Sequence, residues 1–149
     1  MEFTHLDDSG RVSMVDVSAK TPQLRVARAL GRIEINDATL RLIEENKIAK
    51  GSVLTTAEIA GIQAAKRTSD LIPLCHPLQL TKIDVKASVA ENGVAVESRV
   101  VCVGQTGVEM EALTAVSVAL LTIYDMCKAV DKKMIIQNVE LIEKTKNDI

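Results

Sequence analysis

The sequence has 149 residues, the length of a single domain, and 47% of them are apolar, which is enough for a packed core. Phe3 and Tyr124 are the two aromatic residues and Trp is absent, which argues against binding single-stranded nucleic acid by ring stacking. A formal net charge of −2 gives the chain no general attraction for polyanions, so an anionic ligand needs a local cluster of basic side chains.

The expected compartment follows from three features. Residues 1–12 carry acidic side chains and no apolar run, so they do not read as a signal peptide. Residues 113–123, the longest apolar stretch, are too short to cross a bilayer. Cys75, Cys102 and Cys127 are far apart and form no Cys-x-x-Cys pair, so neither a disulfide framework nor a zinc site is expected. The sequence predicts a cytoplasmic protein that binds neither membranes nor nucleic acid.

The first half of the chain begins with a polar segment. Residues 1–24 predict a flexible N-terminal arm, and residues 25–149 predict one folded domain. The apolar pattern of residues 25–35 suits a strand, bent at Gly31.

Two helices are expected next. Asn36 or Asp37 is a suitable N-cap for a helix that runs to about residue 47. Thr55 and Glu58 have the spacing of a capping box, which predicts a second helix extending to about residue 67.

The second half predicts a hairpin, a helix and a strand. Residues 70–79 contain two prolines and predict rigid irregular backbone. Residues 83–102 alternate apolar and polar side chains around Asn92-Gly93, the strongest short signal for a β-hairpin. The longest helical pattern covers residues 108–131, and residues 134–144 predict a last strand.

The predicted order of elements is β-α-α-β-β-α-β. Omitting one helix leaves the β-α-β-β-α-β unit of the ferredoxin-like fold, an α+β sandwich with an antiparallel sheet. Helices then cover one face of the sheet, and the other face is free to contact a partner.

The densest group of chemically useful residues is Leu74-Cys75-His76, which lies between Pro73 and Pro77. A histidine held by prolines suits proton transfer or ligand binding. The alternative is a loop histidine that only bonds to backbone. Cys75 is expected to be a packed thiol or the wall of a pocket.

Two glutamates follow a glycine-containing turn. Thr106 and Glu109 fit a capping box, which gives Glu109 a structural explanation, whereas Glu111 has none. The segment is not a P-loop, because the Gly-Lys-Ser/Thr element is missing.

A third group combines a carboxylate with amines. Asp125 and Lys128 lie three residues apart and share a helix face, either as an exposed ion pair or as a partly buried pair tuned for acid-base work. Together with Lys50 and Lys66, Lys128 could form a triphosphate site if these bases converge.

Helix length limits how these groups combine. Glu111 and Asp125 are fourteen residues apart, so they sit ~20 Å apart on one straight helix. A compact site using both requires two copies of the chain, with their helices antiparallel about a two-fold axis near Val118.

Several segments together resemble the molybdenum cofactor biosynthesis protein C family, the cyclic pyranopterin monophosphate synthases. The matching segments are residues 14–18, 56–67, 72–77, 106–115 and 123–130. The resemblance covers nearly the whole chain, and LCHP and GVEMEALTA are its most specific parts.

The resemblance implies an activity and an assembly. The expected substrate is (8S)-3',8-cyclo-7,8-dihydroguanosine 5'-triphosphate, and the products are cyclic pyranopterin monophosphate and diphosphate. It also implies a ferredoxin-like catalytic domain over residues 25–149 and a homohexamer, a trimer of dimers with the active site at the dimer interface. No cofactor or metal ligand is implied, and a requirement for magnesium is left open.

Site residues are implied in the same way. The family's catalytic positions match Asp125, Lys128 and Lys50. Its substrate-binding positions match Leu74, Cys75, His76, Met110, Glu111, Lys66 and Glu109, with Arg25 and Lys20 as weaker matches. The chain departs from the family in its last residues, 143–149, which lack the usual Gly-Gly-Lys-Ser-Gly tail and leave Lys146 as the candidate for its mobile lysine.

Two other functions fit the same residues. A non-catalytic anion-binding or regulatory module on this fold would bind nucleotides or pterins without releasing diphosphate. A structural oligomer would use Asp125 and Lys128 only as an ion pair.

Overall fold

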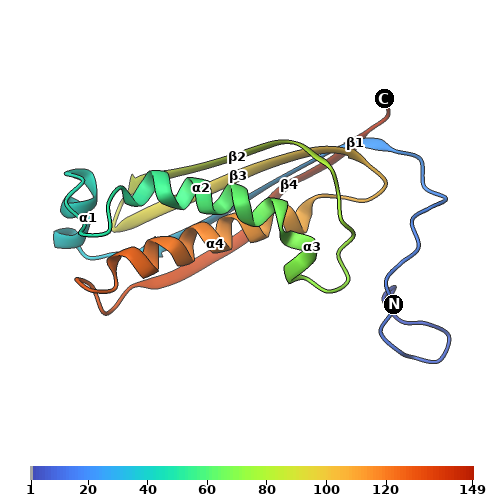
Figure 1. The fold of residues 1–149 in the computed structure, drawn as a ribbon, viewed down its shortest axis with the longest axis horizontal. Coiled ribbons are helices and arrows are strands. Elements are labelled where there is room, and N and C mark those ends of the chain that lie inside the picture. Colours follow the sequence, from blue (N-terminus) through green and yellow to red (C-terminus); the bar gives the residue numbers. More distant parts are fainter. Residues whose placement is uncertain (1) are drawn as a thin grey trace.

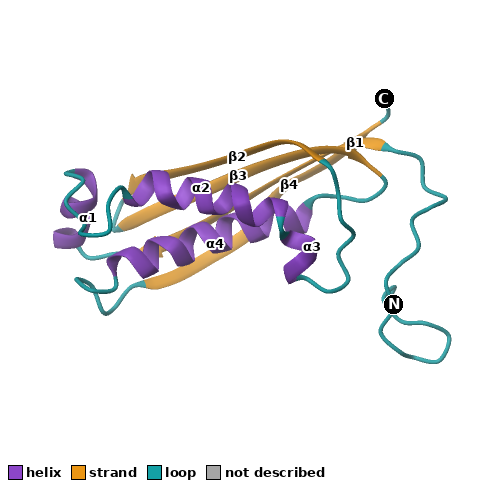
Figure 2. Cartoon of the chain, in the orientation of Figure 1, coloured by secondary structure: helices purple, strands orange, loops and turns teal. Residues whose placement is uncertain are grey.

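A computed structural model describes residues 2–149. Its helices and strands are, in chain order, β1 (Gln23–Glu34), α1 (Asp37–Glu44), α2 (Val53–Lys66), α3 (Thr68–Leu71), β2 (Leu80–Ala90), β3 (Gly93–Gly104), α4 (Glu109–Cys127) and β4 (Ile135–Asn147). The four strands form one antiparallel sheet in the order β2-β3-β1-β4. Helices α2 and α4 lie side by side across one face of it (Figures 1 and 2).

This topology confirms the α+β ferredoxin-like prediction. Helices α2 and α4 are the two helices of the β-α-β-β-α-β unit, and α1 at the end of the sheet is the additional one (Figure 1). The segment predicted to be irregular, residues 70–79, begins within the last two residues of the one-turn helix α3 and is otherwise free of helix and strand. The predicted hairpin is confirmed, with Asn92 at a positive φ of 57° directly before Gly93.

Gly31, where the sequence predicts a bend, lies in the continuous strand β1 and faces helix α4. A Cβ at this position would lie 2.8 Å from Val116 Cγ1 and 2.9 Å from Leu120 Cδ1, so α4 approaches the β1 backbone closely. The pairing of β1 with β4 shifts register between Leu30 and Arg32 at the same point. Glycine is therefore required here by the packing of α4.

Of the first two predicted helix starts, the cap at Asn36 is confirmed and the capping box at Thr55 is wrong. The side chain of Asn36 accepts a hydrogen bond from the Thr39 amide at 2.8 Å, as expected of an N-cap. The capping box at Thr55 does not form, because α2 already begins at Val53. Glu58 instead accepts a hydrogen bond from the Ala87 amide of β2 at 2.9 Å and ties the helix to the sheet.

The core lies between the helical layer and the sheet. Helix α4 supplies much of it, because ten of its residues are buried, among them Ala115, Ala119 and Ile123. Within residues 2–149, α4 is the helix whose length and apolar composition would suffice to span a membrane, but half of that stretch is buried. It is the central helix of the sandwich, whose small residues allow close packing on the strands.

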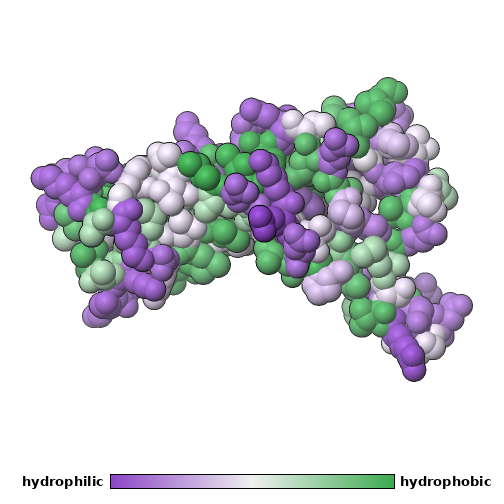
Figure 3. Space-filling view, viewed as in Figure 1, coloured by the Kyte–Doolittle hydropathy of each residue, from purple (hydrophilic) through white to green (hydrophobic). Residues whose placement is uncertain are grey.

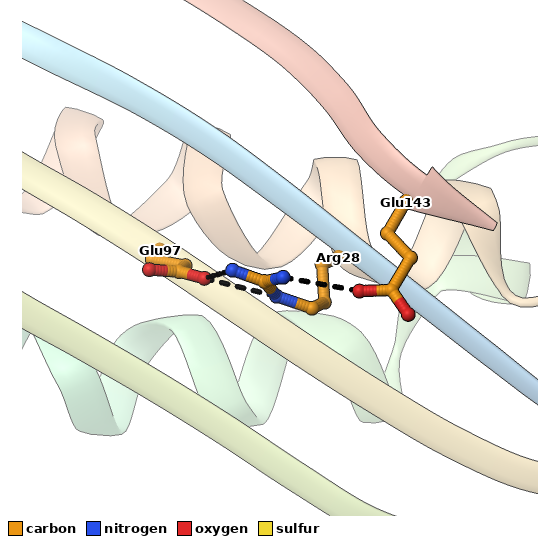
Figure 4. A network of polar contacts seen from close by, with 3 residues as sticks. All are labelled: Arg28, Glu97 and Glu143. Atoms are coloured by element: carbon orange, nitrogen blue, oxygen red, sulfur yellow. Dashed lines mark hydrogen bonds and ion pairs between the residues drawn. The ribbon is translucent and has the colours of Figure 1, made fainter.

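The opposite face of the sheet carries charged side chains. Arg28 of β1 pairs with Glu97 of β3 on one side and with Glu143 of β4, at 3.0 Å, on the other (Figure 4). The network lies on the face away from the helices and links three strands across the central one.

The segment before β1 is ordered by local hydrogen bonds. Leu6 and Val12 form an isolated β-bridge, and the Asp7 side chain accepts bonds from the amides of Ser9 and Arg11, each at 2.9 Å. No other strand or helix precedes Gln23 among the described residues. The arm extends along the end of the molecule at which α4 begins (Figure 1).

Candidate active site

The predicted site residues form two groups at opposite ends of α4. The first, which we call the histidine pocket, surrounds His76 and Glu111 near the start of α4. The second, which we call the aspartate cluster, consists of Lys50, Asp125 and Lys128 near its end.

The histidine pocket is a cavity of about 330 Å³ between the N-terminal arm, the loop before β2 and the first turn of α4. The arm contributes Thr4, His5, Val15, Val17 and Lys20; the loop contributes Leu74, Cys75, His76 and Leu78; the start of α4 contributes Thr106, Gly107, Glu109, Met110 and Glu111. The pocket thus contains both implied substrate-binding segments, and the arm forms one of its walls.

His76 is held by the arm. Its Nε2 lies 2.6 Å from the carbonyl oxygen of Val15, so this ring nitrogen donates the hydrogen bond. In the neutral ring Nδ1 is then left as an acceptor. His76 can therefore bond to the backbone through Nε2 and still offer Nδ1 as an acceptor in the pocket.

Glu111 is a buried carboxyl group at the inner wall of the pocket, with only 4% of its surface exposed. Burial raises its pKa above the ordinary range, its own backbone amide opposes this, and the nearby charge of Glu109 raises it further. A carboxyl group in this setting holds a proton more readily than one in water, as a general acid must.

Glu109 shows that the predicted capping box at Thr106 is wrong. Helix α4 begins without a side-chain cap, and the Glu109 carboxylate instead forms an ion pair with Lys144 of β4. Burial alone would raise the pKa of Glu109, but the hydrogen bond and charge of Lys144, its own amide and the charge of Arg25 together bring it below the ordinary value.

The remaining implied residues of this group also lie here. Lys66, at the end of α2, borders a small recess with His76 and Glu111. Arg25 is buried, and its Nε lies 3.4 Å from the Gly104 carbonyl oxygen. Burial raises the pKa of the half-buried Cys75 thiol, which agrees with a wall of the pocket and not with a nucleophile.

The aspartate cluster is a doubly paired carboxylate. Lys128 Nζ lies 3.0 Å from Asp125 Oδ1, and Lys50 Nζ lies 3.0 Å from Oδ2 and 3.1 Å from the Asp125 backbone oxygen. Hydrogen bonds from Lys128 and then Lys50 lower the pKa of Asp125. Its side chain is 58% exposed, so in the single chain the exposed ion pair, of the two alternatives, is the one that forms.

The three predicted lysines do not converge within one chain. Lys50 and Lys128 meet at Asp125, whereas Lys66 lies beside Glu111 at the other end of the helical layer. Both Glu111 and Asp125 lie on α4, as expected, so ~20 Å separates the groups along the helix. Within residues 2–149, no three His, Cys, Asp or Glu side chains are grouped as a metal site.

Two contacts that hold the site residues could not be predicted from the sequence: the ion pair between Lys144 and Glu109 and the hydrogen bond between His76 and Val15. The segment around Val15 was part of the family resemblance, which was the available signal for it. For Lys144, no local pattern links it to Glu109, thirty-five residues earlier.

A sequence profile of the MoaC family matches residues 14–147, nearly the whole chain. The chain belongs to the MoaC family. Curated relatives in this family include proteins called cyclic pyranopterin monophosphate synthase from Desulfitobacterium hafniense, 55% identical over 97% of this chain and 90% of the relative, and Heliobacterium modesticaldum, 57% identical over 96% and 91%. A third relative of that name, from Thermomicrobium roseum, is 55% identical over 96% of this chain and 87% of its own length.

Proposed function

We propose that this protein is a cyclic pyranopterin monophosphate synthase of molybdenum cofactor biosynthesis. It converts (8S)-3',8-cyclo-7,8-dihydroguanosine 5'-triphosphate to cyclic pyranopterin monophosphate and releases diphosphate. The observation that carries this proposal is the identity of 55–57% with curated enzymes of that name over almost the entire chain.

The histidine pocket suits the part of the reaction that rebuilds the ring system. Opening an imidazole ring and closing a pyrazine ring requires protons to move on and off nitrogen. Glu111 can hold such a proton because it is buried, and His76 has a ring nitrogen not bonded to Val15. The two side chains border the same cavity, so both can reach one bound heterocycle.

The aspartate cluster suits the phosphoryl part of the reaction. Attack of a ribose oxygen on the α-phosphorus forms the cyclic phosphate and develops negative charge on the departing diphosphate. Lys50 and Lys128 can stabilise that charge, and Asp125 holds both ammonium groups within 3.0 Å of its carboxylate before the substrate binds. When the substrate phosphates bind Lys50 and Lys128 in place of Asp125, the Asp125 carboxylate is free to accept or donate a proton.

The two groups act on one substrate if they come from two copies of the chain. A dimer that pairs α4 antiparallel near Val118 brings the pocket of one copy to the aspartate cluster of the other. The outer side of α4 offers a surface for this contact: Leu121 is 57% exposed, and Met110, Leu113 and Ser117 on the same side are only half-buried. Apolar surface is visible on this helical face (Figure 3).

We extend the proposal to a homohexamer, a trimer of such dimers, in the cytoplasm. The three cysteines are free thiols, in agreement with a reducing compartment.

The deciding experiment incubates the purified protein with the cyclised triphosphate and measures diphosphate together with the pterin product. We expect wild-type turnover, and we expect Asp125→Asn to abolish product while the substrate still binds. Asp84→Asn is the matched control, because Asp84 is also an exposed carboxylate paired to a lysine, at 3.3 Å, on strand β2.

Normal turnover by Asp125→Asn would remove Asp125 from the mechanism. Binding without diphosphate release by the wild-type protein would favour the non-catalytic anion-binding module instead.

A further inference from the structure

Lys144 lies on β4, and its ammonium group reaches Glu109 at the first residue of α4. The lysine side chain is 59% exposed, whereas that of Glu109 is 24% exposed and borders the histidine pocket. The ion pair therefore joins the last strand of the sheet to the entrance of the site.

The Glu109 carboxylate occupies a restricted place. It lies over Gly107, where an added Cβ would overlap both carboxylate oxygens. Helix α4 has no side-chain cap at its start, and the Glu109 carboxylate bonds to its own backbone amide. The Lys144 ammonium group of β4 is the partner that holds it from outside the helix.

The surrounding charges make Lys144 the principal partner. Arg25 of β1 adds a more distant positive charge, and Glu111 is the neighbouring acid on α4. The other titratable groups facing this region are the thiols of Cys75 and Cys102 and the pocket residues His5, Lys20 and His76. Only Lys144 forms an ion pair with Glu109 among the described residues.

We propose that Lys144 is a positioning residue, which fixes the Glu109 carboxylate at the edge of the histidine pocket, beside the buried Glu111. An ionised carboxylate only accepts hydrogen bonds. A Glu109 carboxylate held by Lys144 therefore presents an acceptor at a fixed position to a bound heterocycle.

The directions of the two pKa shifts agree with an ion pair between Lys144 and Glu109. The pKa of Glu109 lies below its ordinary value although burial raises it, because Lys144 opposes the burial. The pKa of Glu111 lies above its ordinary value, mainly through burial and further through the charge of Glu109. Loss of Lys144 should raise the pKa of Glu109 and so lower its ionised fraction at a given pH. The charge of Glu109 would then raise the pKa of Glu111 less.

The test compares Lys144→Met, Lys144→Arg and the control Lys86→Met, which removes the same charge from an exposed position on β2. We expect Lys144→Met to lower kcat/KM by about tenfold or more, because the carboxylate is displaced. We also expect the acidic limb of the pH profile of kcat/KM to move to higher pH in this variant, because Glu109 then ionises at higher pH. Lys144→Arg restores both properties, and Lys86→Met matches the wild type.

A second measurement does not depend on activity. Carbon-13 NMR of the glutamate carboxyl groups, assigned with Glu109→Gln, follows the titration of Glu109 directly. We expect this titration to move to higher pH in Lys144→Met and to return in Lys144→Arg. The inference rests on the proposed function for what the pocket binds, but this titration tests the ion pair even if the wild type makes no product.

A double-mutant comparison completes the design. If Lys144 acts through Glu109, adding Lys144→Met to Glu109→Gln lowers kcat/KM no further. An unmoved Glu109 titration in Lys144→Met, or a full additional loss in the double variant, would overturn the proposal.

Discussion

The placement of Glu111 and Asp125 on one helix leads to a quantitative prediction for mixed oligomers. The residues are separated by fourteen positions, or ~20 Å, so each proposed site takes Glu111 from one copy and Asp125 from the other. Glu111→Gln and Asp125→Asn should each be inactive alone. Exchange of subunits between them should restore activity.

The size of the recovery follows from counting sites. After random exchange of equal amounts, a site is intact when its Glu111 comes from the Asp125→Asn chain and its Asp125 comes from the Glu111→Gln chain. Each condition is met in half of the cases, so about a quarter of all sites are intact. Each mixed dimer holds one intact site and one site with both defects.

The assay co-refolds or co-expresses the two variants with different affinity tags, isolates oligomers that carry both tags, and measures diphosphate release per site. Nearly all hexamers built from randomly exchanged chains carry both tags, so doubly tagged oligomers should reach about a quarter of the wild-type rate per site. A mixture of Asp125→Asn with Lys128→Met is the negative control, because both changes lie in the aspartate cluster. Verified mixed dimers without activity would refute the two-copy site.

Two further predictions concern stability. Gly61→Ala should destabilise the fold by about 1–3 kcal/mol in urea unfolding, because the new Cβ would lie 2.9 Å from the Ala115 carbonyl oxygen and from Val85 Cγ1. This clash outweighs the higher helix propensity of alanine. Unchanged stability would show that α2 can move away from α4. Glu111→Gln should gain stability over the wild type as pH rises. The folded pKa of Glu111 is raised above its ordinary value of 4.5, so the wild type is favoured at low pH and loses stability from about that value up to the folded pKa, whereas glutamine does not titrate. Urea curves at pH 4 and pH 8 with the same difference between the proteins would contradict the burial argument.

Hydrophobic periodicity was sufficient to predict most of the fold. The alternation on both sides of Asn92-Gly93 predicted β2 and β3, and the Asn36 cap predicted the start of α1. These signals are local, because a turn or a cap depends on residues within about four positions of one another.

Both failed capping boxes have the same physical cause. Glu58 and Glu109 have the right spacing from a threonine, but each carboxylate binds a group on a distant strand. Glu58 accepts a hydrogen bond from the Ala87 amide, and Glu109 forms an ion pair with Lys144. A local pattern cannot rank a hydrogen bond within the first turn against one formed only after the sheet is assembled. The contact between His76 and Val15 was missed for the same reason.

The length of α4 has a consequence for residues that touch no ligand. Each residue of an α-helix adds about 1.5 Å and about 100° of rotation. Deleting a single residue near Ser117 would therefore turn the side chain at Asp125 to another side of the helix relative to Glu111, although both ends of α4 would keep their own sequence. In a two-fold pair the error would be repeated in both proposed sites, so the middle of this helix sets the distance and the relative orientation of Glu111 and Asp125.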